Sequence, residues 1–231
     1  MTDAAQVSSA PAITTRDLTY RWPGADLVIT YPDITLARGQ HLFLQGPSGS
    51  GKSTLLSMLC GLASAQAGKL VVMGEDLRAL SAGKRDQFRA DYLGVIFQQF
   101  NLVPYLNTTA NVTLPCRLSR RRRQRVTGSP EQEASSLLKA LGLEPGDWQR
   151  PVTALSVGQQ QRVAAARALI GGPSVVLADE PTSALDTDNR DRFLELLLGQ
   201  AKAQGTSVIL VSHDPGLANH FDASISLGAP S

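Results

Sequence analysis

The sequence has few aromatic residues, little net charge and no long hydrophobic run. Aromatic side chains make up 5% of its 231 residues, and the formal charge is +2. That balance is too small to predict nucleic-acid binding from overall charge. No apolar run approaches the roughly 18 residues typical of a membrane span. With 42% hydrophobic and 18% charged residues, the composition also excludes a disordered chain and predicts a sizeable core.

Cysteine is scarce as well. Cys60 and Cys116 are far apart and form no C-x-x-C pair. We therefore expect neither a zinc site nor a disulfide framework, and a reducing compartment fits this usage. Residues 1–15 contain no Lys or Arg and no long apolar run, so a signal peptide is not predicted. Residues 1–12 are expected to form a flexible leader before a single domain over 13–231.

Strand-like and helix-like segments alternate along most of the chain. Strands are predicted over 13–19, 27–31, 41–44, 93–97, 175–178 and 207–211, and helices over 52–62, 158–170 and 188–204. A capping box at Ser129 and Gln132, with Pro130 at the first helical position, predicts a further helix ending near Gly142. The pattern favours an α/β fold whose parallel sheet is covered on both faces, with a mostly helical lobe inserted between residues 101 and 153.

A glycine-rich loop stands between a predicted strand and a predicted helix. Its sequence, Gly46-Pro47-Ser48-Gly49-Ser50-Gly51-Lys52-Ser53, matches G-x-x-x-x-G-K-[ST]. The glycines let successive backbone N–H groups point at phosphate oxygens, beside the positive end of the following helix. Lys52 is expected to reach the β- and γ-phosphates and the Ser53 hydroxyl to bind Mg²⁺. Such a loop predicts nucleoside triphosphate binding without separating kinases, GTPases and transport ATPases.

Two carboxylates, Asp179 and Glu180, follow the apolar strand predicted over 175–178. A carboxylate at the carboxyl end of a parallel strand can share Mg²⁺ with Ser53, which is the role we expect for Asp179. Glu180 is then placed to polarise an attacking water. Considered alone, an acidic pair after a strand is more often an ordinary helix N-cap.

The segment Leu155-Ser156-Val157-Gly158-Gln159 heads a predicted helix and begins 103 residues after Lys52. In isolation this segment predicts only a good helix start. Following a phosphate loop at this distance, it resembles the signature sequence of ATP-binding cassette (ABC) proteins. The resemblance covers nearly all of residues 13–228. One departure is Val157, where the family usually has glycine, and this could alter nucleotide affinity or the pace of dimer closure.

Further segments resemble other ABC motifs. Gln98, within Phe97-Gln98-Gln99-Phe100, resembles the glutamine of the Q-loop that senses Mg²⁺ and water. Residues 183–186 (Ser-Ala-Leu-Asp) resemble the D-loop, and His213 resembles the switch histidine that contacts the γ-phosphate. Trp22, directly before Pro-Gly, resembles the adenine-stacking aromatic, with Tyr20 as the alternative.

The resemblance implies an ABC ATPase fold: a P-loop α/β core with a parallel sheet, an N-terminal antiparallel β subdomain and a helical subdomain inserted over about 100–157. It also implies that ATP and Mg²⁺ bind. The catalytic residues implied are Glu180, His213 and Gln98. The metal-binding residues implied are Ser53, Gln98 and Asp179. The residues implied to contact ATP are Trp22, Gly46, Pro47, Ser48, Gly49, Ser50, Gly51, Lys52, Ser53, Thr54, Ser156, Gly158 and Gln159.

The family resemblance also predicts partners. Two copies are expected to close head-to-tail on two ATP molecules and to drive separate transmembrane permease subunits from the cytoplasmic face of the inner membrane. The segments 97–104 and 111–115 resemble the branch with lipoprotein-release, macrolide-export and cell-division ATPases. A regulatory ATPase that gates a membrane partner without transport is the alternative. No nucleic-acid partner is expected, because the long coiled-coil insertions, zinc modules and tandem cassettes of DNA- or ribosome-acting relatives are absent.

A run of arginines lies within the predicted helical lobe, at residues 120–123 and 125. Charge runs are most often a solvated helix end. The functional alternative is contact with anionic lipid headgroups or with an acidic patch on the permease. Nucleic-acid binding is not favoured, since no aromatic residues are interleaved with the arginines.

Overall fold

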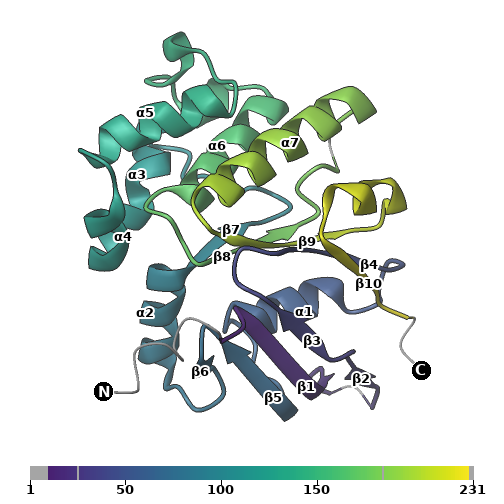
Figure 1. Ribbon diagram of the computed structural model, residues 1–231. Helices are drawn as coiled ribbons and strands as arrows, with labels where there is room; N and C mark the ends of the chain where they lie inside the picture. Colours follow the sequence, from purple (N-terminus) through teal and green to yellow (C-terminus); the bar gives the residue numbers. More distant parts are fainter. Residues whose placement is uncertain (1–9, 25, 184, 229–231) are drawn as a thin grey trace.

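The computed structural model describes residues 10–24, 26–183 and 185–228, which form two five-stranded sheets (Figure 1). The parallel sheet has the order β10-β4-β9-β8-β7, with bounds Ala223–Ser226 (β10), His41–Gln45 (β4), Ser207–Ser212 (β9), Val175–Asp179 (β8) and Leu93–Ile96 (β7). The antiparallel sheet contains Ile13–Arg21 (β1), Val28–Thr30 (β2), Ile34–Leu36 (β3), Ala67–Val72 (β5) and Glu75–Asp76 (β6).

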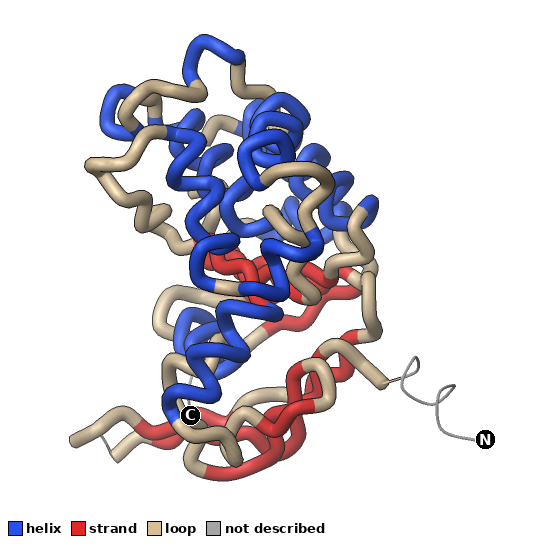
Figure 2. The backbone as a smooth tube through the Cα atoms, turned by 90° about the vertical axis from the view of Figure 1, so that its left-hand side faces the viewer, coloured by secondary structure: helices blue, strands red, loops and turns tan. Residues whose placement is uncertain are grey.

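Seven α-helices lie in the described part of the chain. Their bounds are Lys52–Leu59 (α1), Ala82–Tyr92 (α2), Thr108–Leu118 (α3), Arg120–Arg125 (α4), Pro130–Ala140 (α5), Val157–Leu169 (α6) and Thr187–Ala203 (α7). Short 3-10 helices cover Pro145–Asp147 (η1), Val152–Ala154 (η2) and Pro215–His220 (η3). Figures 1 and 2 show α1 between the two sheets, with α3 to α7 gathered beyond the other face of the parallel sheet.

The parallel sheet is buried on both faces, as its apolar strands predict. Along β8, Val175 and Leu177 belong to the core shared with α1 and the antiparallel sheet. The alternate residues Val176 and Ala178 belong to the core shared with α6 and α7. The parallel pairing register places the carboxyl ends of β4, β8 and β9 at one edge, where Gln45 pairs with Ser212 and Asp179 pairs with Val211.

Local sequence signals account for several helix starts. The Ser129 side chain accepts a hydrogen bond from the Gln132 backbone, and the Gln132 side chain accepts one from the Ser129 backbone, so the predicted capping box at α5 is confirmed. The Asn107 side chain caps α3 by accepting a hydrogen bond from Ala110 N, and the Asp186 side chain caps α7 by accepting one from Asn189 N; neither cap was predicted. The strands β3, β5, β6 and β10 and helix α2 were also missed, because they are short or largely exposed and carry weak periodicity.

The start of the chain is only partly described. Residues 1–9 of the expected leader lie outside the described residues. Ala12, at the end of that leader, is fully buried; its N–H donates to Leu36 O and its carbonyl accepts from Met73 N. No helix among the described residues combines the length and apolarity that crossing a membrane requires.

The arginine run is not uniformly solvated. Arg122 in α4 is 2% exposed. Its guanidinium donates to Ile170 O, Leu93 O and Ala168 O, at the C-terminal end of α6 and the start of β7. The sequence suggested a solvated helix end or a contact with lipid or permease for this run, and both interpretations are wrong for Arg122. Arg122 instead ties the helical lobe to the core.

Candidate functional site

The phosphate loop, residues 46–53, connects β4 to α1 at the carboxyl edge of the parallel sheet. Gly51 has φ +88°, and a Cβ there would lie 2.7 Å from the Tyr31 hydroxyl oxygen, so the position requires glycine. The Tyr31 hydroxyl donates to Gly51 O at 3.2 Å. Burial raises the pKa of Tyr31 to about 12, so this hydroxyl keeps its proton and braces the loop. Tyr31 was not identified from the sequence, because no local sequence pattern indicates that its side chain contacts the phosphate loop.

Lys52 is buried within the loop that precedes it. Its ammonium donates to Gly46 O at 2.7 Å and to Pro47 O at 2.9 Å. These carbonyls hold the charge at the mouth of the loop, where phosphate oxygens could replace them. Ser50 Oγ is buried with no hydrogen-bond partner among the described residues, and Ser50 is not among the residues that line the cavity beside the loop.

Asp179 and Ser53 meet at the edge of the sheet. Burial raises the pKa of Asp179, and a hydrogen bond from the Ser53 side chain partly offsets that rise. Asp179 Oδ1 is buried and has no hydrogen-bond partner among the described residues. A buried, unpartnered carboxylate oxygen next to a hydroxyl is an oxygen donor set that Mg²⁺ prefers. The residues present therefore fit a magnesium ion.

Glu180 and His213 contact each other across the sheet edge. His213 Nδ1 lies 3.0 Å from Glu180 Oε1, and Ser212 Oγ donates to Glu180 Oε2 at 3.2 Å. Glu180 has φ +45°, an uncommon conformation for a residue with a side chain. Its backbone N–H donates to Val211 O at 2.9 Å, which holds the carboxylate near the loop. The ordinary N-cap alternative does not apply, because α7 begins at Thr187 and is capped by Asp186.

One cavity of about 440 Å³ gathers most of the predicted residues. It is lined by Trp22, Ser48, Gly49, Gly51, Lys52, Ser53, Thr54, Gln98, Glu180, Ser183 and His213. Trp22 is 53% exposed, whereas Tyr20 is buried and packs edge-on against Trp22 with ring centroids 5.2 Å apart. Of the two aromatic candidates, the tryptophan therefore has its face available to a ligand. Ala184, in the predicted D-loop, lies outside the described residues.

The predicted signature residues are not in that cavity. Ser156, Gly158 and Gln159 line a different one of about 490 Å³, with Leu185, Asn189 and others. Ser156 and Gln159 form a capping box at the start of α6, so their side chains support the helix in this state. Val157 is 52% exposed at the same helix start. Within one molecule, the structure separates the phosphate loop from the signature segment.

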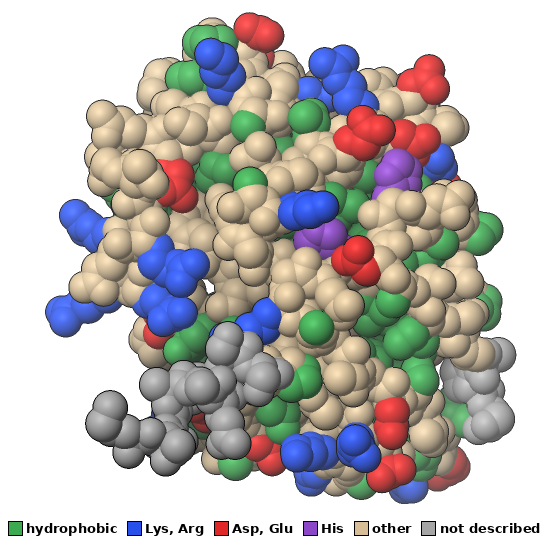
Figure 3. Space-filling model, in the orientation of Figure 1, with side chains coloured by type: hydrophobic (Ala, Val, Ile, Leu, Met, Phe, Trp, Pro, Cys, Tyr) green, Lys and Arg blue, Asp and Glu red, His purple; other side chains and the backbone are tan. Residues whose placement is uncertain are grey.

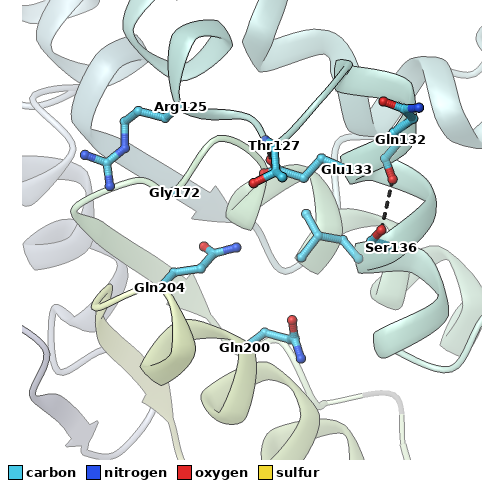
Figure 4. A pocket seen from close by; sticks show the side chains of 9 residues that line it. Arg125, Thr127, Gln132, Glu133, Ser136, Gly172, Gln200 and Gln204 are labelled. Carbon is cyan, nitrogen blue, oxygen red and sulfur yellow. Dashed lines mark hydrogen bonds between the residues drawn. The ribbon is translucent and has the colours of Figure 1, made fainter.

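A further cavity of about 390 Å³ lies between the helical lobe and α7 (Figure 4). Arg125, Gln132, Gln200 and Gln204 are among its lining residues, and none of the predicted site residues is. Glu133 at this cavity accepts hydrogen bonds from Thr127 N and Gly171 N, at 2.7 and 2.8 Å. Glu133 therefore has a structural role, in which it ties α5 to the turn after α6.

The fold and site together define a class. A phosphate loop runs from the parallel strand β4 into helix α1, and the carboxylates after β8, separated from β4 by β9 in the same sheet, lie on the same edge. This arrangement is that of a P-loop nucleoside triphosphatase.

Comparison with known proteins identifies the family. A family model described as "ABC transporter" matches residues 30–183. The ABC transporter ATP-binding protein YbbA of Escherichia coli K12 is 39% identical over 200 residues, which is 87% of this chain and 86% of YbbA. The lipoprotein-releasing system ATP-binding protein LolD of Shewanella sp. MR-7 is 39% identical over 200 residues, covering 87% of this chain and 84% of LolD.

A solved structure agrees. The dimeric, post-hydrolysis ATP-binding cassette MJ0796, bound to ADP and Pi, has a TM-score of 0.82 and 32% identity, covering 93% of this chain and 94% of that one. The chain belongs to the ABC transporter family, as an ATP-binding domain that hydrolyses ATP.

Proposed function

We propose that this chain is the ATPase subunit of an exporter-type ABC transporter in the lipoprotein-release branch, and that it moves a separate membrane permease. The observation that carries the proposal is the division of the predicted site between two cavities. Lys52, Glu180 and His213 lie around one, and Ser156 and Gly158 around the other. A second copy, turned head-to-tail, would bring its signature segment to the first copy's phosphate loop. The MJ0796 cassette is described as a dimer.

The chemistry we propose is phosphoryl transfer to water by positioning and charge stabilisation. Lys52 exchanges its carbonyl partners for the β- and γ-phosphate oxygens of ATP. Mg²⁺, held by Ser53, Asp179 and Gln98, would neutralise phosphate charge. Glu180 orients the attacking water and accepts its proton, while His213, held by Glu180, reaches the γ-phosphate. Trp22 stacks on the adenine.

The permease would contact a groove beside Gln98. A cavity of about 260 Å³ there is lined by Leu93, Gly94, Val95, Phe97, Asn101, Leu114, Pro115, Leu118, Arg122, Arg167 and Ala168. Phe97 is the neighbour of Gln98, so movement in the ATP cavity would reach the groove directly. Arg167 donates to Phe100 O and Asn101 O and so attaches this loop to α6, the signature helix. We place the subunit peripherally, at the cytoplasmic face of the inner membrane.

The first test is Glu180→Gln, which keeps the shape of the side chain and removes its basicity. ATP binding should persist while turnover falls by about 10²–10⁴-fold, the usual contribution of a general base. ATP-Mg²⁺ should then trap a dimer detectable by size-exclusion chromatography with light scattering. Glu195→Gln, an exposed acid on α7, is the matched control and should behave as wild type. Near-normal hydrolysis by Glu180→Gln would remove Glu180 from this role.

The second test identifies the partner. The tagged Glu180→Gln protein is used to capture complexes from native membranes in ATP-Mg²⁺. A multi-span protein with a large extracytoplasmic domain supports the proposal. Ribosomes or DNA-repair proteins without a membrane protein would contradict it. Transport of a labelled lipid or compound by the reconstituted pair separates an exporter from a regulatory ATPase that only gates its partner.

A further inference from the structure

The segment around the permease groove carries charge of one sign only. Between Asp91 and Glu131 the sequence contains no Asp or Glu. It contains six arginines, at positions 117, 120, 121, 122, 123 and 125. This segment includes the whole of α3 and α4. Its positive charge therefore has no local counter-charge within the segment.

The structure holds α4 in one orientation. Arg122 is directed into the core, where it donates to backbone carbonyls of β7 and α6. Arg121 lies over the Tyr92 ring, 4.4 Å from its centroid. Ser119, at the junction of α3 and α4, donates to Asp91 in α2. Because these contacts fix the inner side of α4, Arg120 and Arg123 are presented outward by a rigid support, while Arg125 lines the cavity beside α7.

The outward surface combines positive charge with one large apolar side chain. Arg117, Arg120 and Arg123 are exposed, and none forms a salt bridge with a residue described by the structure. Leu118, between them, is 66% exposed. Figure 3 shows Lys and Arg side chains protruding on the left side of the molecule, where α4 lies in Figure 1. We refer to Arg117, Leu118, Arg120 and Arg123 as the cationic platform.

We propose that the cationic platform binds the anionic phospholipid headgroups of a membrane. A lipid surface fits the combination of three exposed arginines, with no salt-bridge partner among the described residues, and an exposed leucine beside them. Arg120 and Arg123 are three residues apart in α4 and therefore lie on one face of that helix, where an extended layer of negative charge can meet both. The exposed Leu118 can enter the boundary between headgroups and acyl chains, while the flexible arginine side chains reach the phosphates. Arginine also matches phosphate geometry with paired N–H donors.

The location of the cationic platform agrees with the proposed function. The biological role of this surface rests on that proposed function. Leu118 belongs both to the platform and to the lining of the groove assigned to the permease. A subunit whose groove grips a membrane protein would hold this side toward the bilayer. Contact with headgroups would then orient the subunit and add to its affinity for the permease.

The test uses purified full-length protein, without nucleotide or permease, and measures co-sedimentation with vesicles. One set of vesicles is pure phosphatidylcholine, and the other contains one third phosphatidylglycerol. Binding should require phosphatidylglycerol and weaken as salt rises, because salt screens exposed charges. Arg120→Gln/Arg123→Gln should lower the partition coefficient about 30-fold, since each arginine near an anionic surface contributes roughly a fivefold factor. Leu118→Ser should weaken binding further without changing the dependence on phosphatidylglycerol.

The matched control is Arg16→Gln/Lys69→Gln. It removes the same charge from two exposed residues that face each other across β1 and β5, away from α4. This variant should bind vesicles as wild type does. Equal loss in both double variants, equal binding to phosphatidylcholine, or no loss at the platform would each overturn the proposal. The proposal would also be overturned if platform substitutions weakened binding only to membranes that contain the permease, because the partner would then be an acidic protein segment. ATPase activity and permease capture, measured in the same variants, report on the proposed function independently.

Discussion

The substitution Arg122→Met offers the sharpest test of how the helical lobe is attached to the core. Burial lowers the pKa of Arg122 to about 10, so the guanidinium is still charged at neutral pH. It donates to three carbonyl groups, Ile170 O at 2.8 Å, Leu93 O at 3.1 Å and Ala168 O at 2.6 Å. Methionine fills similar space and supplies no donor, so these carbonyls lose their charged partner.

The expected cost follows from two opposing contributions. Hydrogen bonds to a charged group stabilise by about 1.5–3 kcal/mol each, and three acceptors are affected. Removing a buried charge returns roughly 3 kcal/mol, judged from the lowering of the Arg122 pKa. The net destabilisation is then about 1.5–6 kcal/mol, which corresponds to a fall on the order of 10 °C in Tm for a chain of this size.

The assay is thermal and urea unfolding followed by circular dichroism. Arg120→Met is the matched control, because Arg120 is exposed in the same helix and should change stability by less than about 0.5 kcal/mol. Equal stability of the two variants would refute the assignment of Arg122 as the attachment of the lobe. The pair also complements the vesicle experiment, in which Arg120 matters for lipid binding and not for stability.

Three further outcomes are expected. Burial lowers the pKa of His41, and neither ring nitrogen has a hydrogen-bond partner among the described residues. Below a pH of about 6.5 the unfolded chain therefore binds this proton more readily than the folded chain does, and the wild-type Tm should fall as the pH drops. His41→Leu should flatten that dependence in thermal melts, and an unchanged slope would exclude His41 as the cause. Asp179→Asn should weaken ATP binding in Mg²⁺ and leave binding in EDTA nearly unchanged, as measured by calorimetry. Trp22→Ala should weaken ATP binding about 2- to 13-fold, from a stacking contribution of about 0.5–1.5 kcal/mol, and Trp22→Phe should weaken it much less. A larger loss with Tyr20→Leu would favour Tyr20 instead.

Parts of the site can be predicted from the sequence because residues close together in the chain form them. The phosphate loop needs its glycines and lysine in sequence, and Ser156 with Gln159 forms a capping box from residues three apart. The roles assigned to Trp22 and His213 depended on family resemblance, because stacking and phosphate contacts join distant segments. Tyr31 was missed for the same reason, since it reaches Gly51 across 20 residues.

The arginine run shows most clearly what a sequence leaves open. The five arginines have the same charge and the same intrinsic helix propensity, so the sequence determines that this segment is positively charged and helical. Tertiary structure decides that Arg122 is buried against backbone carbonyls, that Arg121 covers Tyr92, and that Arg120 and Arg123 face solvent. The sequence likewise determined the chemistry of the phosphate loop, but the assembly of one cavity from strands distant in sequence was decided by sheet register. Burial and pairing are properties of contacts between distant segments, and such contacts exist only once the chain has folded.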